Sequence, residues 1–139
     1  MSTARNKAVM RRFFQAFEEK DRDALEEVLA PELVAHHPGS PEPLNREALL
    51  QTIEAFSAAF SDQEYTIEEQ VAEGDKVVTH TVWQATHTGN FQGQPPTGKQ
   101  VAITGIATDR IEDGKIVEHQ VLMDTMGLMQ QLGMVPPAG

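Results

Sequence analysis

The stretch VAITGIATDRIEDGKIVEHQVLMD, residues 101–124, decides the fold class of this 139-residue chain. Two runs rich in Val, Ile, Thr and Leu flank a tight turn at Glu112-Asp113-Gly114. Asp-Gly between apolar runs is a strong hairpin signal, because both residues readily adopt the positive φ that a two-residue turn requires. The sequence therefore predicts long strands over residues 101–111 and 116–123.

The same period-two pattern extends upstream of this hairpin. Tyr65, Ile67 and Val71 alternate with polar residues, a turn follows at 73–75, and residues 77–87 are dense in Val, Thr, Trp and His. These residue types favour strands. We expect a second hairpin here, joined to the first by a Gly/Pro-rich connection over residues 89–98.

The N-terminal third is predicted to be mainly helical. Apolar residues recur at helical spacing over residues 3–20, a short helix over 21–29 follows with Asp21 as its N-cap, and 33–36 is a short extended segment. Prolines in 37–43 predict a loop. Asn45 can cap a third helix, whose apolar residues at three-and-four spacing are Leu49, Leu50, Ile53, Phe56, Ala59 and Phe60.

Helices followed by a meander of strands indicate the α+β class. We expect three N-terminal helices packed on a strongly curved antiparallel sheet that encloses a pocket. Residues 1–139 should form a single domain, with 135–139 as a tail, because 40% hydrophobic residues can supply one core.

The composition excludes several classes of function. There is no cysteine, which removes disulfides, thiolate nucleophiles and Cys-ligated zinc. A formal charge of −10 disfavours nucleic acid as a partner. No run approaches the ~20 apolar residues of a membrane span and no signal peptide is visible, so we expect no membrane partner and a cytoplasmic location. Without HExxH or a compact His/carboxylate spacing, no metal site is expected.

Alternation along the last strand predicts which side chains reach the pocket. One face carries Ile116, Glu118, Gln120, Leu122 and Asp124, which we assign to the pocket. The other face carries Val117, His119, Val121 and Met123. We expect a second subunit to cover its apolar residues Val117, Val121 and Met123, which makes the protein a homodimer or higher homo-oligomer.

Asp124 has two interpretations. It can be the N-cap of a closing helical turn, accepting a bond from a backbone N–H two or three residues later. Alternatively, it is a general acid/base in an apolar setting of Leu122, Met126 and Leu128, where desolvation would raise its pKa toward neutral pH.

Five further residues are candidates for substrate binding: His36, His80, Arg110, Glu118 and Gln120. The two histidines can relay protons, although a lone histidine at a strand is also a common structural residue. Arg110 can pair with Glu118 or Asp124, or bind a substrate carbonyl. Polar groups that face a core need partners, so pocket lining would explain both Glu118 and Gln120.

Two segments carry a family resemblance: Thr86–Lys99 (THTGNFQGQPPTGK) and Asp113–Gly133, which runs from DGKIVEHQ through Asp124 to GLMQQLG. They resemble the SnoaL-like polyketide cyclase (ester cyclase) family of the nuclear-transport-factor-two-like superfamily. Residues 33–38, LVAHHP, fit as well, so the resemblance spans nearly the whole chain.

The resemblance implies a cone-shaped α+β barrel, usually a homo-oligomer, with a deep apolar pocket for a small apolar molecule. It also implies that the acidic residue at Asp124 is the general acid/base of an intramolecular aldol ring closure without metal or cofactor, and we therefore favour catalysis over capping. This chain differs from many members at Gln120, where they have Trp, and at His80, where they have Arg. The alternatives are a non-catalytic small-molecule-binding domain, or hydrolysis or isomerisation in the same pocket.

Overall fold

The computed structural model describes residues 2–134, and the predicted tail at 135–139 lies outside them. The described residues form four helices and one five-stranded sheet. The helices are α1 (Thr3–Glu18), α2 (Arg22–Val28), α3 (Arg46–Ser57) and α4 (Thr125–Gln131). The strands are β1 (Leu29–His36), β2 (Phe60–Glu73), β3 (Lys76–His87), β4 (Gln100–Glu112) and β5 (Lys115–Met123).

The predicted helix starts are confirmed by their caps. The Asp21 carboxylate accepts a bond from the Ala24 N–H at 3.1 Å, and the Asn45 side chain accepts one from the Ala48 N–H at 2.8 Å. Each bond satisfies a backbone donor that has no partner within the helix. The third helix ends earlier than predicted, because Ala58 is its C-cap and Phe60 begins β2.

The strand order in the sheet is β1-β5-β4-β3-β2. Pairing between β2, β3, β4 and β5 is antiparallel, but β1 runs parallel to β5, so the sheet is mixed and the expectation of a wholly antiparallel sheet was wrong. The sheet is not closed, since β1 and β2 are its two edges. The predicted turn is confirmed, with Asp113 at φ 52° and Gly114 at φ 77°.

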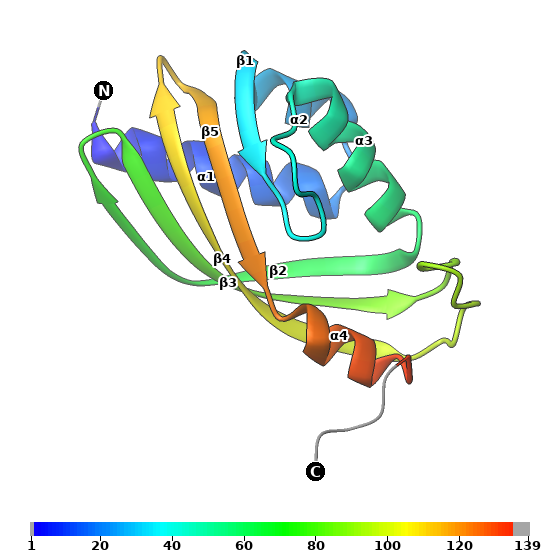
Figure 1. Cartoon of the computed structure of the whole chain (residues 1–139). Coiled ribbons are helices and arrows are strands. Elements are labelled where there is room, and N and C mark those ends of the chain that lie inside the picture. Colours follow the sequence, from blue (N-terminus) through cyan, green and yellow to red (C-terminus); the bar gives the residue numbers. More distant parts are fainter. Residues whose placement is uncertain (1, 135–139) are drawn as a thin grey trace.

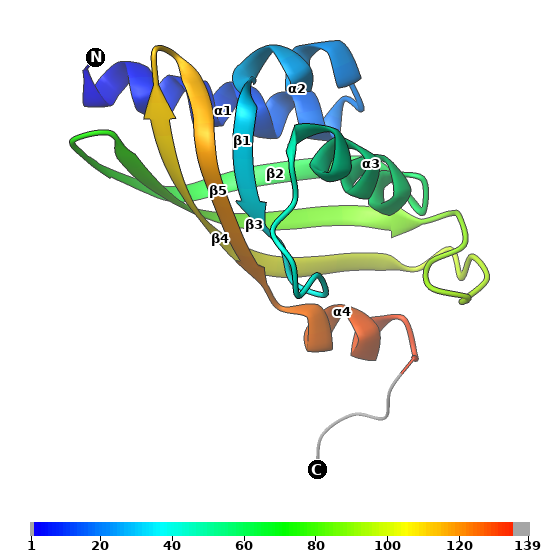
Figure 2. The ribbon, with the colours of Figure 1, turned by 45° about the horizontal axis from the view of Figure 1, so that its top comes forward.

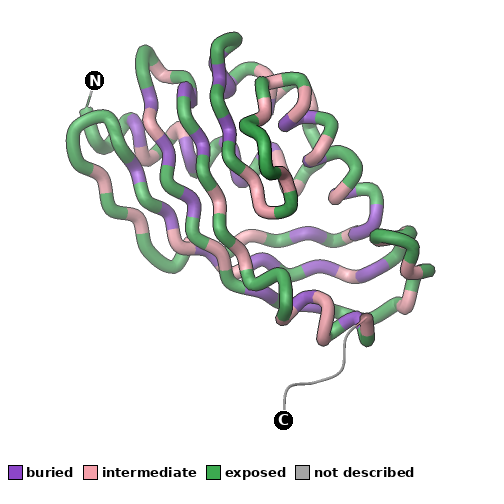
Figure 3. The backbone as a smooth tube through the Cα atoms, viewed as in Figure 1, coloured by how far each residue is buried: buried purple, intermediate pink, exposed green. Residues whose placement is uncertain are grey.

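Three helices lie on the concave side of this strongly twisted sheet, as Figures 1 and 2 show, while α4 extends from the end of β5. Burial alternates along the strands, so one face of the sheet packs inward and the other is exposed (Figure 3). The described residues include no helix long and apolar enough to cross a membrane.

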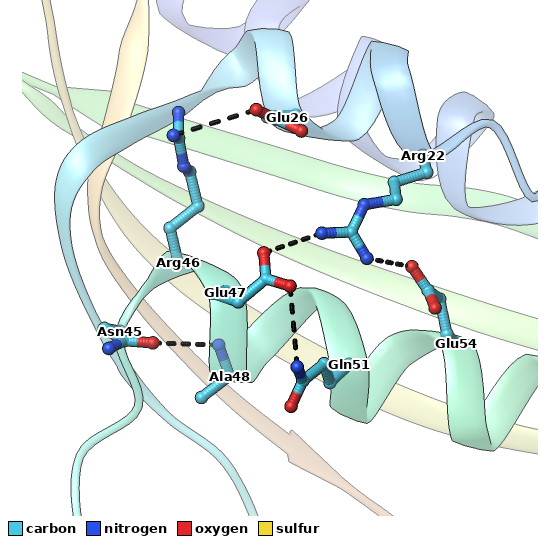
Figure 4. Close-up of polar contacts among 8 residues, drawn as sticks. All are labelled: Arg22, Glu26, Asn45, Arg46, Glu47, Ala48, Gln51 and Glu54. Atoms are coloured by element: carbon cyan, nitrogen blue, oxygen red, sulfur yellow. Dashed lines mark hydrogen bonds and ion pairs between the residues drawn. The ribbon is translucent and has the colours of Figure 1, made fainter.

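Ion pairs connect α2 to α3 (Figure 4). Arg22 binds the carboxylate of Glu47 at 2.6 Å and also that of Glu54, and Arg46 lies 3.8 Å from Glu26. Exposed pairs of this kind each contribute little to stability. They link α2 to the outer side of α3, whose inner side lines the cavity described next.

Candidate active site

An apolar cavity of about 60 Å³ lies between the concave face of the sheet and the helices. Aromatic side chains of α1, α3 and the sheet form much of its wall: Phe13, Phe14, Phe17, Phe56, Tyr65 and Trp83. Such walls exclude water and strengthen electrostatic interactions inside. The polar groups that enter this space are therefore the candidates for chemistry.

A buried Asp–His pair lies next to the cavity. Asp109 on β4 and His119 on β5 are register partners on neighbouring strands, and both point to the inner face. His119 Nδ1 lies 2.5 Å from Asp109 Oδ1, and the two side chains are 4% and 0% exposed. His119 lines the cavity. Because Nδ1 is bound to Asp109, Nε2 is the ring nitrogen that remains for a ligand.

Burial sets the electrostatics of this pair. It raises the pKa of Asp109, while the charge and the hydrogen bond of His119 act in the opposite direction. Asp109 Oδ2 is buried without a partner, so the carboxylate interacts with the protein through one oxygen. The Phe13 ring packs on His119 with centroids 5.3 Å apart. The arrangement fixes the orientation of an imidazole in an apolar cavity, as a carboxylate does in a catalytic triad.

His37 lies where the cavity meets a larger outer groove. The groove has a volume of about 410 Å³ and shares His37, Thr52, Phe56 and Met123 with the cavity wall. His37 Nδ1 is 3.0 Å from the Pro38 carbonyl oxygen, to which it donates. Burial lowers the pKa of His37, the hydrogen bond to the Pro38 carbonyl acts in the opposite direction, and the charge of His119 adds to the lowering. The net effect favours the neutral imidazole of His37.

Asp124 lies outside the cavity. It is exposed, and its Oδ1 accepts a bond from the Gly127 N–H at 2.9 Å, which makes it the N-cap of α4. Leu122 and Met126, which were expected to bury it, are 64% and 58% exposed. The expected desolvated setting is therefore wrong, and the capping interpretation is confirmed.

The predicted inward face of β5 was also wrong. Glu118, Gln120 and Leu122 are exposed on the outer face, whereas Val121 and Met123 line the cavity and Val117 is buried. The reason is an irregularity between β4 and β5: Ile111 pairs with Ile116, but Arg110 pairs with Glu118, so Val117 is an extra residue. Such a bulge reverses the alternation for the rest of the strand.

The other predicted binding residues share this outer position. His36 is exposed, and His80 lies opposite Ile106 on the outer side of β3. Arg110 binds Glu112 at 2.7 Å and Glu118 at 2.9 Å, which confirms the predicted pairing with Glu118 and holds the pKa of that carboxyl below its usual value. None of the five predicted residues lines the cavity within residues 2–134.

Sequence reasoning missed the Asp109–His119 pair. The available signal was an aspartate inside the apolar run 101–111 and a histidine inside the strand 116–123. Their pairing depends on the bulge, because a regular hairpin would have placed Asp109 opposite Glu118. The described residues contain no group of three His, Cys, Asp or Glu side chains that could hold a metal ion.

Comparisons with known proteins relate this chain to polyketide cyclases. A family model described as SnoaL-like polyketide cyclase matches residues 7–132. Aklanonic acid methyl ester cyclase DnrD of Streptomyces peucetius is 30% identical over 130 residues, covering 90% of this chain and 88% of that protein. Nogalonic acid methyl ester cyclase of Streptomyces nogalater is 32% identical over 88 residues, covering 63% of this chain and 66% of that protein.

A similar fold occurs in the crystal structure of AclR from Streptomyces galilaeus. The TM-score is 0.89 at 27% sequence identity, and the match covers 99% of this chain and 91% of AclR. The helices and the sheet are thus arranged as in a solved relative.

Proposed function

Because the chain belongs to the SnoaL-like polyketide cyclase family, we propose that it closes a ring in a polyketide methyl ester by an intramolecular aldol reaction that uses no cofactor. The names of two relatives, which are methyl ester cyclases, support this substrate class. The observation that carries the mechanism is the His119–Asp109 pair at an apolar cavity.

In the proposed mechanism, His119 is the base. Its Nε2 removes a proton from a carbon activated by neighbouring carbonyls, and Asp109 holds Nδ1 so that the imidazolium is stabilised. The enolate carbon attacks a carbonyl of the same molecule, and a C–C bond forms. The proton taken by His119 then passes to the new alkoxide oxygen, so the product is an isomer of the substrate.

The cavity as it stands is too small for a multi-ring substrate. A cavity volume of about 60 Å³ has room for only a few water molecules, since a cavity needs roughly 10–15 Å³ to hold each one. The substrate must therefore extend into the outer groove, with the shared side chains Phe56 and Met123 turning aside. A folded substrate held in this way approaches the geometry needed for ring closure.

The proposed activity is tested by incubating the native protein with aklanonic acid methyl ester, with and without EDTA. We expect a cyclised product of unchanged mass at a rate that the chelator does not alter. Liquid chromatography with mass spectrometry measures both. A carboxylic acid that is lighter than the ester by one CH2, formed with release of methanol, would indicate hydrolysis. An ester bound but recovered intact would indicate a binding domain, and a chelator-sensitive rate would overturn the cofactor-free mechanism.

We also propose that a second copy of the chain covers the outer face of the sheet, through residues that differ from those predicted. Ile106 and Leu122 are register partners there and are 47% and 64% exposed, and His80 extends the row onto β3. No helix of the described residues lies on this face (Figure 2). A row of exposed apolar side chains on an open sheet is typical of an interface between subunits.

Leu122→Lys is expected to convert the assembly to monomers, because each interface would bury two lysine charges without partners. Sedimentation velocity at micromolar concentration measures the change. Ala8→Lys, at an exposed position of α1 on the opposite side of the sheet, is the matched control and should leave the assembly intact. A native protein that sediments as a monomer contradicts the proposal.

A further inference from the structure

The inward-facing polar side chains of the cavity are almost all bonded within the protein. Thr52 donates to the Ala48 carbonyl at 2.9 Å, and Trp83 Nε1 donates to Gln63 Oε1 at 3.0 Å. Thr81 reaches the Gly105 carbonyl at 3.5 Å. His37 and His119 use their Nδ1 atoms as described above. These groups have little donor capacity left for a substrate oxygen.

Tyr65 is the exception. It lies on the inner face of β2 and lines the cavity, and its hydroxyl has no hydrogen-bond partner among residues 2–134. Its ring is fixed between two aromatic rings of α1, with centroids 4.8 Å from Phe14 and 5.3 Å from Phe17. Tyr65 is half-buried, and its hydroxyl is not one of the buried polar atoms that lack a partner, so the oxygen is accessible and can donate to a ligand in the cavity.

The surroundings keep this phenol protonated. Burial raises the pKa of Tyr65, and the negative charge of Glu18, which accepts a bond from the Tyr65 N–H at 2.8 Å, raises it further. At neutral pH the side chain is therefore a hydrogen-bond donor. Tyr65 and His119 also lie against adjacent rings of one helix, because Phe14 packs on Tyr65 and Phe13 on His119.

We propose that the Tyr65 hydroxyl donates a hydrogen bond to the substrate oxygen that becomes negative when His119 removes the proton from carbon. This assignment rests on the proposed function. It supplies the hydrogen-bond donor to the oxyanion, which the mechanism with His119 and Asp109 alone does not contain. A fixed donor in an apolar site stabilises a developing oxyanion without reorganisation. Tyr65 keeps its own proton throughout, since His119 returns the transferred proton to the alkoxide.

The test uses 4-nitrophenolate as a stable mimic of the enolate and nitrobenzene as the same ring without the oxygen. Quenching of Trp83, the single tryptophan and a cavity residue, reports the binding of both. The native protein is expected to bind nitrophenolate more tightly than nitrobenzene. Tyr65→Phe should weaken nitrophenolate binding about 10- to 100-fold, the usual range for a hydrogen bond to a charged group, and leave nitrobenzene binding unchanged.

Thr52→Val is the matched control, because it removes a cavity hydroxyl that is already bonded to Ala48. It should preserve the preference for nitrophenolate over nitrobenzene. Equal nitrophenolate affinity in native protein and Tyr65→Phe overturns the proposal, as does a native protein without preference for nitrophenolate. The binding measurement needs no turnover, so it stands apart from the test of the proposed cyclisation: a protein that binds nitrophenolate through Tyr65 but leaves the ester unchanged would contradict only the proposed function.

Discussion

Replacing His119 with glutamine is expected to lower kcat/KM for the methyl ester by about 10²–10⁴-fold, the usual contribution of a general base. Glutamine retains a polar side chain that can donate to Asp109, so the buried carboxylate is not left without a donor. The imidazole Nε2 is lost, however, and glutamine cannot accept a proton near neutral pH. Steady-state kinetics measure the loss, and circular dichroism checks that the variant is folded.

Asp109→Asn tests whether the pair acts as a unit. The asparagine NH₂ would donate to His119 Nδ1, so the proton of a neutral imidazole would move to Nε2 and the base would become a donor. A loss comparable to that of His119→Gln is expected, and the double variant should lose little more than either single one. Fully multiplicative losses would contradict the coupling inferred from the 2.5 Å contact.

Asp124→Asn is the control that separates the two acid/base assignments. The asparagine oxygen can still accept the bond from the Gly127 N–H, so the cap of α4 is retained while the carboxylate is removed. We expect kcat/KM to remain close to the native value. A loss as large as that of His119→Gln would mean that Asp124, and not the buried pair, is the catalytic residue.

Much of the fold could be predicted because its signals are local. Asp21 and Asn45 mark helix starts by their side-chain chemistry, and Asp113-Gly114 marks the hairpin by its backbone preference. The parallel placement of β1 beside β5 could not be predicted in this way. It joins residues about 80 positions apart, such as Ala35 and His119, and depends on packing that no local pattern encodes.

The candidate site was misplaced for a more specific reason. The alternation was counted from Ile116, which does face the core, but Val117 is an additional residue in β5. After it the predicted face points outward, and His119 takes the place assigned to Glu118. Nothing in the sequence Ile116-Val117 distinguishes a bulge from a regular strand. One unrecognised extra residue therefore placed both binding candidates on this strand, Glu118 and Gln120, on the wrong face of the sheet.

A second misassignment concerns Phe60. Helical spacing from Leu49 placed it in the third helix, but the chain leaves the helix at Ala58, and Phe60 pairs with His87 as the first residue of β2. The spacing persists across the boundary because Phe56 and Phe60 both face the same aromatic cluster, with centroids 5.0 Å apart. Burial, not helical structure, explains the pattern at this position.

This position gives the largest expected effect on stability. Phe60 is 0% exposed, and its ring contacts Trp83 and Phe91 with centroid distances of 4.9 and 5.5 Å. Phe60→Ala is therefore expected to lower the free energy of unfolding by about 3–5 kcal/mol, as large-to-small core substitutions do. Urea denaturation followed by far-UV circular dichroism measures it without depending on Trp83, whose fluorescence the substitution alters directly.

Phe60→Leu is the matched control, because it retains most of the apolar volume and should cost less than Phe60→Ala, on the order of 1–2 kcal/mol. A further comparison is Phe91→Ala: its ring is in the same cluster but partly exposed on the connection after β3, so less apolar surface would return to water. The expected order of destabilisation is Phe60→Ala, then Phe91→Ala. The reverse order would mean that Phe91 in the connecting loop contributes more to the stability of the protein than Phe60 at the start of β2.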